Sequence, residues 1–155
     1  MRSSIFYILI VSIFFTSCGE EDYFLEYKSL KDQTWNVNDT LEFDIEIDDE
    51  NAGYNIYVNI RNTKDYVWSN MHMHVITEAP SGKEVNHRKE FRLFDEQGKW
   101  TGKNSGTLVD NSFLTYEKWQ FPEKGTYKIY LVHGMYDEDL TEISDIGIKV
   151  EKISN

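Results

Sequence analysis

Apolar and polar residues alternate along the first half of the chain with a period of two. Between Thr40 and Asp48, acidic residues separate four apolar ones: Leu41, Phe43, Ile45 and Ile47. After a polar interruption the alternation resumes at Tyr54, Ile56, Val58 and Ile60. A period of two is typical of a β-strand that buries one face. The pattern therefore predicts an antiparallel pair of strands over 41–47 and 54–61.

Further short strands are expected in the rest of the chain. They fall at residues 71–78, 85–93, 116–121, 126–132 and 146–152. Proline and glycine at 79–82 and 122–125 suit the turns between neighbouring strands. Residues 137–143 have the length of one helical turn, and no longer helical period occurs. About seven or eight strands predict an all-β fold, a two-sheet antiparallel β-sandwich of jelly-roll or immunoglobulin-like type.

The alternation also sets the expected domain organisation. A chain of 155 residues is long enough for one domain with one core. The regular pattern begins at Thr40, which assigns residues 40–155 to the β-sandwich domain. Residues 18–39 are expected to form a tether and lead-in, in which Trp35 is the first residue that packs on the sandwich.

Composition narrows the classes of function. The chain carries 27 acidic and 16 basic side chains, for a net charge of -11, and 40% of its residues are hydrophobic. That much apolar material argues against a disordered polymer. Nucleic acid is not an expected partner, because binding to it depends on Lys and Arg displacing counterions. The single cysteine, Cys18, excludes an internal disulfide and a cysteine-rich zinc site.

The N-terminus has the pattern of a lipoprotein signal peptide. A basic residue precedes an apolar run over 5–15, which is too short to cross a hydrocarbon core of about 30 Å as a helix. Two small residues then precede Cys18, as in a bacterial lipobox. We expect residues 1–17 to be removed and Cys18 to be lipidated, so that acyl chains anchor the protein in a membrane.

An acidic run, Gly-Glu-Glu-Asp at residues 19–22, follows the cysteine. It is similar to the export signal that sends lipoproteins of the Bacteroidota to the outer leaflet of the outer membrane. We therefore expect a lipid-anchored protein of the outer membrane, with the surface favoured over the periplasmic face. An acidic linker explains the run nearly as well, so both faces remain open.

Four residues on one face of the expected strand 54–61 are the main candidates for partner binding: Asn55, Tyr57, Asn59 and Arg61. Tyrosine offers contact area at a low entropy cost, and arginine offers a rigid set of donors. A solvated strand face, or a ladder of hydrogen bonds to neighbouring segments, explains the row equally well. Trp68, in the connection after this strand, is the tryptophan expected to be exposed and completes the candidate set.

The remaining chemistry-bearing residues favour neither a metal site nor an enzyme. His72 and His74 share one face of a strand, but zinc needs three or four converging ligands, which favours surface histidines. The acidic loops at 48–51 and 137–142 lack the ligand spacing of a calcium loop. The sequence contains no serine-hydrolase or zinc-protease motif. We expect no catalytic residue, no metal and no cofactor.

Three blocks of the chain also match a family pattern. The first is residues 54–62, followed by Tyr66, Ser69 and Asn70. The second is residues 93–102, and the third begins at 121–127 and continues to Lys152. In their order and spacing, and together with the lipobox, these blocks resemble the GldH family of gliding-motility lipoproteins. The resemblance covers nearly all of the chain.

This resemblance implies a non-catalytic structural or accessory binding subunit. The protein would be a cell-envelope lipoprotein needed for gliding motility and linked to type IX secretion. Its expected partners are envelope proteins of those systems, together with the membrane that holds the acyl anchor on Cys18. The alternative is a surface glycan-binding lipoprotein, in which Trp68 and Tyr57 stack on sugar rings.

Overall fold

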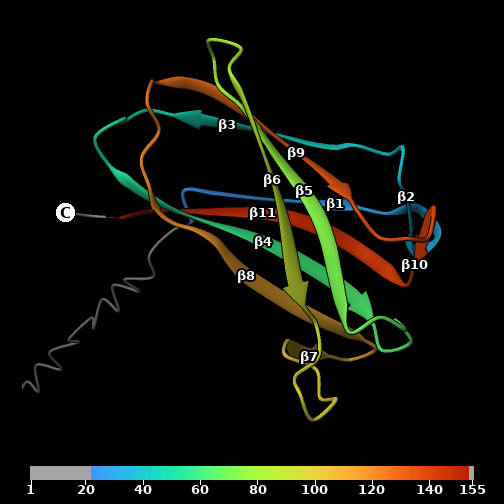
Figure 1. The fold of residues 1–155 in the computed structure, drawn as a ribbon. Coiled ribbons are helices and arrows are strands. Elements are labelled where there is room, and N and C mark those ends of the chain that lie inside the picture. The colour runs from blue at the N-terminus through green and yellow to red at the C-terminus, as the bar shows by residue number, and fades with distance from the viewer. Residues whose placement is uncertain (1–21, 154–155) are drawn as a thin grey trace, which may run out of the picture.

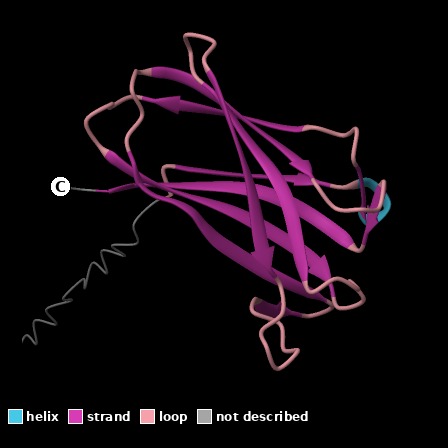
Figure 2. Ribbon diagram, in the orientation of Figure 1, coloured by secondary structure: helices cyan, strands magenta, loops and turns pink. Residues whose placement is uncertain are grey.

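The computed structural model describes residues 22–153, and the predicted signal peptide and Cys18 lie outside this range. The described part contains one short 3-10 helix, η1 (Lys31–Gln33), and no helix long and apolar enough to cross a membrane. Its other regular elements are strands, which dominate the ribbon in Figure 2. In chain order they are β1 (Phe24–Ser29), β2 (Thr34–Asn36), β3 (Leu41–Ile47), β4 (Gly53–Thr63), β5 (Asn70–Glu78), β6 (Glu84–Arg92), β7 (Lys103–Ser105), β8 (Leu108–Trp119), β9 (Gly125–His133), β10 (Asp139–Thr141) and β11 (Ile143–Ile153).

The strands form two main sheets and a small ribbon. One sheet has the order β1-β11-β4-β8-β7, the other has the order β3-β9-β5-β6, and β10 pairs with β2. Every pairing between these strands is antiparallel. Figure 1 shows the two main sheets as separate layers. The predicted all-β, antiparallel class is confirmed, while the jelly-roll and immunoglobulin-like types stay predictions.

The core lies between the layers and follows the alternation of the sequence. In β3, Phe43, Ile45 and Ile47 are fully buried, whereas the acidic residues between them are exposed. In β4 the core residues alternate with half-buried Asn55 and Tyr57, and the alternation of burial ends at Asn59, which is itself buried. Burying one such apolar side chain contributes about 1.5–3 kcal/mol, so the facing rows of these sheets supply much of the stability. Both predicted strands are therefore present, but the prediction that they pair with each other is wrong: they lie in different sheets, where β3 pairs with β9, and β4 pairs with β11 and β8.

Two expected elements differ from the structure. The strand expected at 116–121 is β8, which begins at Leu108, because Asp110 and Asn111 are paired rather than solvated. Asn111 is buried and donates to Asn62 Oδ1 at 3.0 Å. The helical turn expected at 137–143 is wrong. Those residues form β10, in which buried Leu140 lies opposite Trp35, and then turn into β11.

The segment expected as a lead-in carries two strands. β1 pairs along its whole length with β11, from Phe24 opposite Val150 to Ser29 opposite Asp145. Trp35 in β2 is fully buried, as the sequence predicted for its packing, and its Nε1 donates to the Asp39 carbonyl at 2.8 Å. The layers therefore begin at about residue 24, upstream of the expected boundary at residue 40.

The two long sides of the sandwich differ. On one side β1 lies beside β3, where the Tyr23 hydroxyl donates to the Glu46 carbonyl at 2.7 Å and the Lys28 ammonium lies 5.5 Å from the centre of the Phe43 ring. On the other side β6 ends the four-stranded sheet, and β7 continues the five-stranded sheet only beside residues 108–110. The rest of β8 and the whole of β6 therefore border an open side.

Buried His133 predicts a pH dependence of stability. Its ring packs edge-on against Trp35 at 5.3 Å, and burial lowers its pKa below the usual 6.5. The unfolded chain therefore binds a proton that the folded chain resists, so stability falls as the pH drops below about 6.5. We expect the melting temperature of the wild type to fall between pH 6.5 and 5 more steeply than that of His133→Phe. Equal slopes in the two proteins would contradict this.

Candidate functional site

The predicted row of polar residues lies on β4 at the centre of its sheet. β4 has β11 on one side and β8 on the other. Asn55, Tyr57, Asn59 and Arg61 alternate with the core residues of the strand, so they face away from the second sheet. The structure therefore brings these four residues together on one outer face, which we call the β4 face.

Arg61 is held between two carboxylates and a ring. Its Nε lies 2.5 Å from Asp110 Oδ1 and its Nη1 lies 3.5 Å from Asp145 Oδ2, while its guanidinium carbon sits 5.0 Å from the centre of the Tyr27 ring. Burial alone would raise the pKa of Asp145, but hydrogen bonds from Ser29 and Ser144 and the charge of Arg61 lower it. The guanidinium thus crosslinks β1, β4, β8 and β11.

Tyr57 is also engaged by its neighbours. Its hydroxyl donates to Glu151 Oε2 at 2.8 Å, and the Lys149 ammonium lies 4.2 Å from its ring centre and 2.6 Å from Glu151 Oε1. Burial, followed by the hydrogen bond to Glu151, raises the pKa of the Tyr57 hydroxyl. One face of the Tyr57 ring is therefore covered by an ammonium group.

The two asparagines of the β4 face differ. Asn55 Oδ1 accepts the backbone N–H of Lys118 at 3.0 Å, which holds an irregular part of β8. Asn59 is only 3% exposed, and its Oδ1 has no hydrogen-bond partner among residues 22–153. Exposed apolar side chains complete this sheet: Leu25, Tyr27 and Leu114. The row is thus largely a ladder of contacts to neighbouring strands, and its role in partner binding stays a prediction.

Trp68 lies apart from the row, in the loop between β4 and β5. It is 40% exposed, and its Nε1 donates to Asp137 Oδ2 at 3.1 Å. Val67 and Tyr136, in this loop and in the β9–β10 loop, are 81% and 99% exposed. Within the described residues, no side-chain hydrogen bond or ion pair joins Trp68 to the β4 face. The candidate set therefore occupies two places, a sheet face and a loop end.

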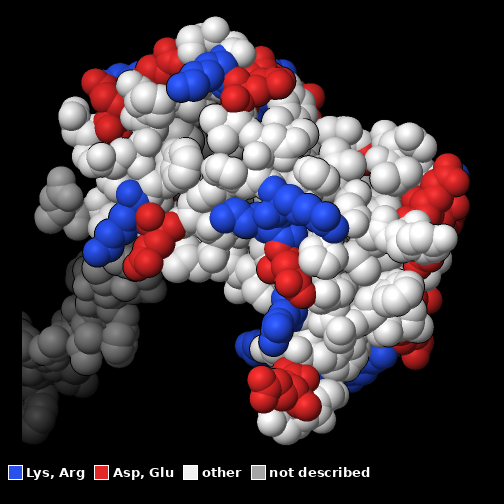
Figure 3. Space-filling view, in the orientation of Figure 1, with Lys and Arg blue, Asp and Glu red and all other residues white. Residues whose placement is uncertain are grey.

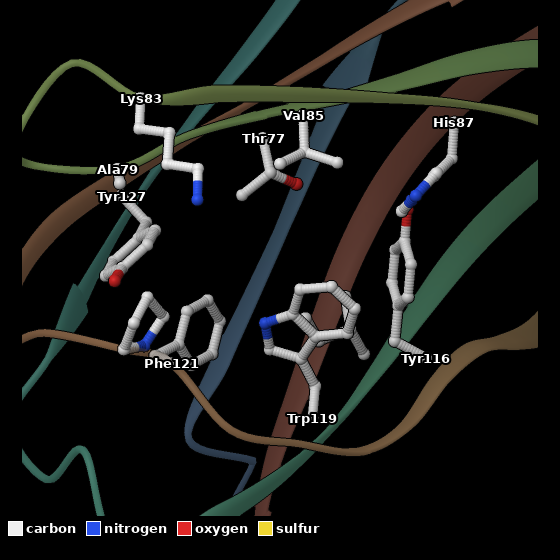
Figure 4. A pocket seen from close by; sticks show the side chains of 11 residues that line it. Thr77, Ala79, Lys83, Val85, His87, Tyr116, Trp119, Phe121 and Tyr127 are labelled. Carbon is white, nitrogen blue, oxygen red and sulfur yellow. The ribbon is translucent and has the colours of Figure 1, made fainter.

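The open side of the sandwich contains a cavity that the sequence did not predict. It has a volume of about 150 Å³ and lies where β6 and β8 border the space between the sheets. Its lining is mainly aromatic and aliphatic, as Figure 4 shows: Thr77, Val85, Tyr116, Trp119, Phe121 and Tyr127. We call it the open-side cavity.

A distortion of β8 builds this cavity. In a regular strand, Tyr116 and Trp119 would point to opposite faces because they are three residues apart. The pairing of β8 with β4 shifts register between Tyr54 and Tyr57, and Lys118 has a φ of 49°. Both rings therefore line the same cavity and contact each other edge-on at 4.8 Å. Two aromatic residues three positions apart in a predicted strand, such as Tyr116 and Trp119, are therefore a sequence signal of such a distortion.

Polar groups mark two sides of the open-side cavity. Figure 4 shows the Lys83 amine directed at the aromatic rings from the β5–β6 turn, with His87 and Tyr116 on the far side. His87 Nδ1 and the Tyr116 hydroxyl share a hydrogen bond of 2.8 Å, and burial raises the pKa of Tyr116 to about 12. An apolar cavity of this volume accommodates one aromatic ring or a short branched chain.

The acidic loops and the histidines of the described residues do not come together around a common point where a metal ion could bind. Within residues 22–153, no group of three or more His, Cys, Asp or Glu side chains is placed to hold a metal ion. In the acidic loop at 48–51, Asp48 and Asp49 bind Lys152 at 2.9 and 3.6 Å. His72 and His74, which were expected on the surface, are half-buried on one face of β5. His133 is buried because it follows Ile129 and Leu131 on the inner face of β9. The acidic loop therefore serves to bind the C-terminal strand.

Comparisons with known proteins agree with the sequence blocks. The sequence model of the GldH lipoprotein family matches residues 22–150. The gliding motility lipoprotein GldH homolog of Christiangramia forsetii is 28% identical over 100% of both chains, and the gliding motility lipoprotein GldH of Flavobacterium johnsoniae is 28% identical over 94% of both. No solved structure matches the chain. The chain belongs to the GldH lipoprotein family.

Proposed function

We propose that this lipoprotein is a non-catalytic accessory subunit of the gliding-motility apparatus, linked to type IX secretion. The observation that carries the proposal is the similarity over nearly the full length to relatives named gliding motility lipoproteins. The match includes the described sandwich from residue 22 to residue 150. The acyl chains on Cys18 hold the protein at the outer membrane, and the sandwich binds envelope proteins of the apparatus.

Two surfaces support a binding role. On the β4 face Arg61 lies in the same outer sheet surface as two exposed residues of the neighbouring strands, Tyr27 and Leu114. Arginine, tyrosine and an exposed aliphatic side chain together are typical of protein interfaces. The loop end with Val67, Trp68 and Tyr136 exposes large apolar side chains. We propose that Asn55, Tyr57, Asn59, Arg61 and Trp68 contribute to these two contacts.

The glycan-binding alternative finds less support. Sugar rings stack on free aromatic faces, but the Lys149 ammonium lies 4.2 Å from the centre of the Tyr57 ring. Trp68 is partly exposed, yet its indole N–H is already bound by Asp137. We therefore do not extend the proposal to glycans.

Deletion of the gene is expected to abolish colony spreading and type IX secretion together. A subunit that both processes require has this effect, whereas a substrate-capture protein affects growth on its glycan and leaves spreading intact. The measurements are colony spreading and the amount of secreted cargo in the medium, with the gene restored on a plasmid as the control. Normal spreading and secretion in a clean deletion strain would disprove the proposed function.

A further inference from the structure

β6 is a free edge strand beside the open-side cavity. It is the last strand of its sheet, and among residues 22–153 it pairs only with β5. Val85 and His87, on its inner face, line the cavity. A free edge exposes a row of unpaired backbone groups that pair readily with another extended chain.

The backbone groups that point outward can be assigned from the hydrogen bonds at the two ends of β6. The Ala79 N–H donates to the Lys83 carbonyl at 2.8 Å, and the Leu93 N–H donates to the Ser69 carbonyl at 2.9 Å. In an antiparallel pair, every second residue of a strand directs its N–H and C=O to the same neighbouring strand. Since Lys83 and Leu93 bond toward β5, the odd-numbered residues between them also bond to β5. The N–H and C=O groups of Asn86, Arg88 and Glu90 are therefore directed to the free edge.

The free edge of β6 ends at Arg92. The next outward carbonyl, that of Arg92, accepts the Thr101 hydroxyl at 2.9 Å. No backbone hydrogen bond between residues of the described part joins the free edge at 86–90 to another segment. The exposed row thus has room for about five residues of an added strand.

The charge of β6 is opposite to that of the whole protein. From Lys83 to Arg92 four basic side chains stand against two acidic ones, Glu84 and Glu90, in a chain whose net charge is -11. Figure 3 shows basic atoms gathered in the middle of the face where Figure 1 places β6. On the outer face of β6 between residues 86 and 92, Arg88 and Arg92 lie on either side of Glu90, whose Oε1 already accepts the side-chain amide of Asn70 at 2.7 Å. The two arginines favour acidic side chains opposite them on an added strand.

We propose that an extended segment of a protein partner, with alternating apolar and acidic residues, adds to β6 as a further strand. Its backbone bonds to Asn86, Arg88 and Glu90. One apolar side chain enters the open-side cavity, whose volume of about 150 Å³ fits one ring or branched chain. Acidic side chains on the other face of the segment lie beside Arg88 and Arg92.

A second copy of this chain is the competing occupant. In an antiparallel pair of two β6 strands centred on Arg88, that residue faces its own copy, which is unfavourable, while Arg92 faces Glu84, which is favourable, so the dimer measurement below separates the two occupants. That the partner is an envelope protein rests on the proposed function. The binding step itself is testable without the gliding apparatus.

The test uses the full lipoprotein in detergent and a blocked peptide of seven residues in which glutamate and leucine alternate. We expect the peptide to bind, to quench or shift Trp119 fluorescence, and to slow amide exchange at Asn86, Arg88 and Glu90. Asn86→Pro removes one outward N–H without touching the bonds to β5, so we expect affinity to fall about tenfold. Asn86→Ala keeps that N–H and is the matched control, with a loss below about twofold.

Two further variants leave the backbone of β6 unchanged. Val85→Glu places a carboxylate at the cavity and is expected to weaken binding by about tenfold or more. Arg88→Glu should weaken binding more than Lys31→Glu, which makes the same charge change at an exposed residue of η1. Melting temperatures close to that of the wild type show that each variant is folded.

Several results would overturn the proposal. A peptide with lysine in place of glutamate that binds equally well would refute the charge argument. Unchanged affinity in Asn86→Pro, with binding of free benzene in the cavity, would identify a small-molecule site instead. Protection of the same amides in a dimer without peptide would identify a second copy as the occupant. A deletion strain without a motility defect would refute the proposed function and leave the peptide result standing.

Discussion

Trp35→Ala is expected to reduce the free energy of unfolding by about 3–5 kcal/mol. Trp35 is fully buried, packs edge-on against His133 and donates its indole N–H to the Asp39 carbonyl. The substitution removes all three contributions and leaves a cavity at the junction of β2, β9 and β10. Small domains are stable by only about 5–15 kcal/mol, so the variant loses a large share of that. The measurement is urea unfolding followed by circular dichroism.

Trp68→Ala is the matched control for this experiment. It makes the same substitution at a tryptophan that is 40% exposed and lies in a loop, so the expected loss is below about 1 kcal/mol. Similar losses in the two variants would contradict the structure. The comparison also tests the domain boundary, because a large loss at Trp35 shows that residues before Thr40 are part of the cooperative fold.

The alternation of the sequence predicted those strands that have one apolar and one polar face. β3 is the clearest case, since Phe43, Ile45 and Ile47 alternate with exposed acidic residues. β1 was missed because it is an edge strand in which each face mixes apolar and polar residues, for example Phe24 with Glu26 on one face and Leu25 with Ser29 on the other. The start of β8 was missed because its polar residues pair with Arg61 and Asn62, which are far away in the sequence.

The sequence could predict only those features of the candidate site that are formed by a single strand. Alternation alone places Asn55 to Arg61 on a common face of β4. It gives no information on Asp110 and Asp145, which engage Arg61 from β8 and β11. The open-side cavity depends on the order of strands in two sheets and on the register shift of β8, neither of which is a local property of the sequence. That is why the cavity and the free edge of β6 required the three-dimensional structure.

The position of β1 limits how the anchored protein can be oriented. The Tyr23 ring contacts Tyr54 edge-on at 5.3 Å, and its hydroxyl binds Glu46 and Asp48 beside the β3–β4 turn. Tyr23 is the fifth residue after Cys18, and an extended chain spans at most about 3.6 Å per residue, or about 18 Å over these five steps. An anchor on Cys18 therefore holds this end of the sandwich near the membrane surface, and Trp68 at the far ends of β4 and β5 is directed away from it.

Cys18→Ala is expected to release the protein from the membrane completely. The cysteine thiol is the proposed attachment point of the acyl chains, and each buried methylene contributes about 0.8 kcal/mol, so once residues 1–17 have been removed no other part of this acidic chain replaces them. We expect no incorporation of labelled palmitate, loss of the protein from the membrane fraction, and the same spreading defect as in the deletion strain. Glu20→Ala combined with Glu21→Ala is the control, because it retains the cysteine and is expected to change exposure at the cell surface, measured by protease accessibility, but not acylation. A Cys18→Ala protein that still carries palmitate and sediments with the membrane would show that the anchor is elsewhere, and would remove the basis for placing the Tyr23 end of the sandwich at the membrane.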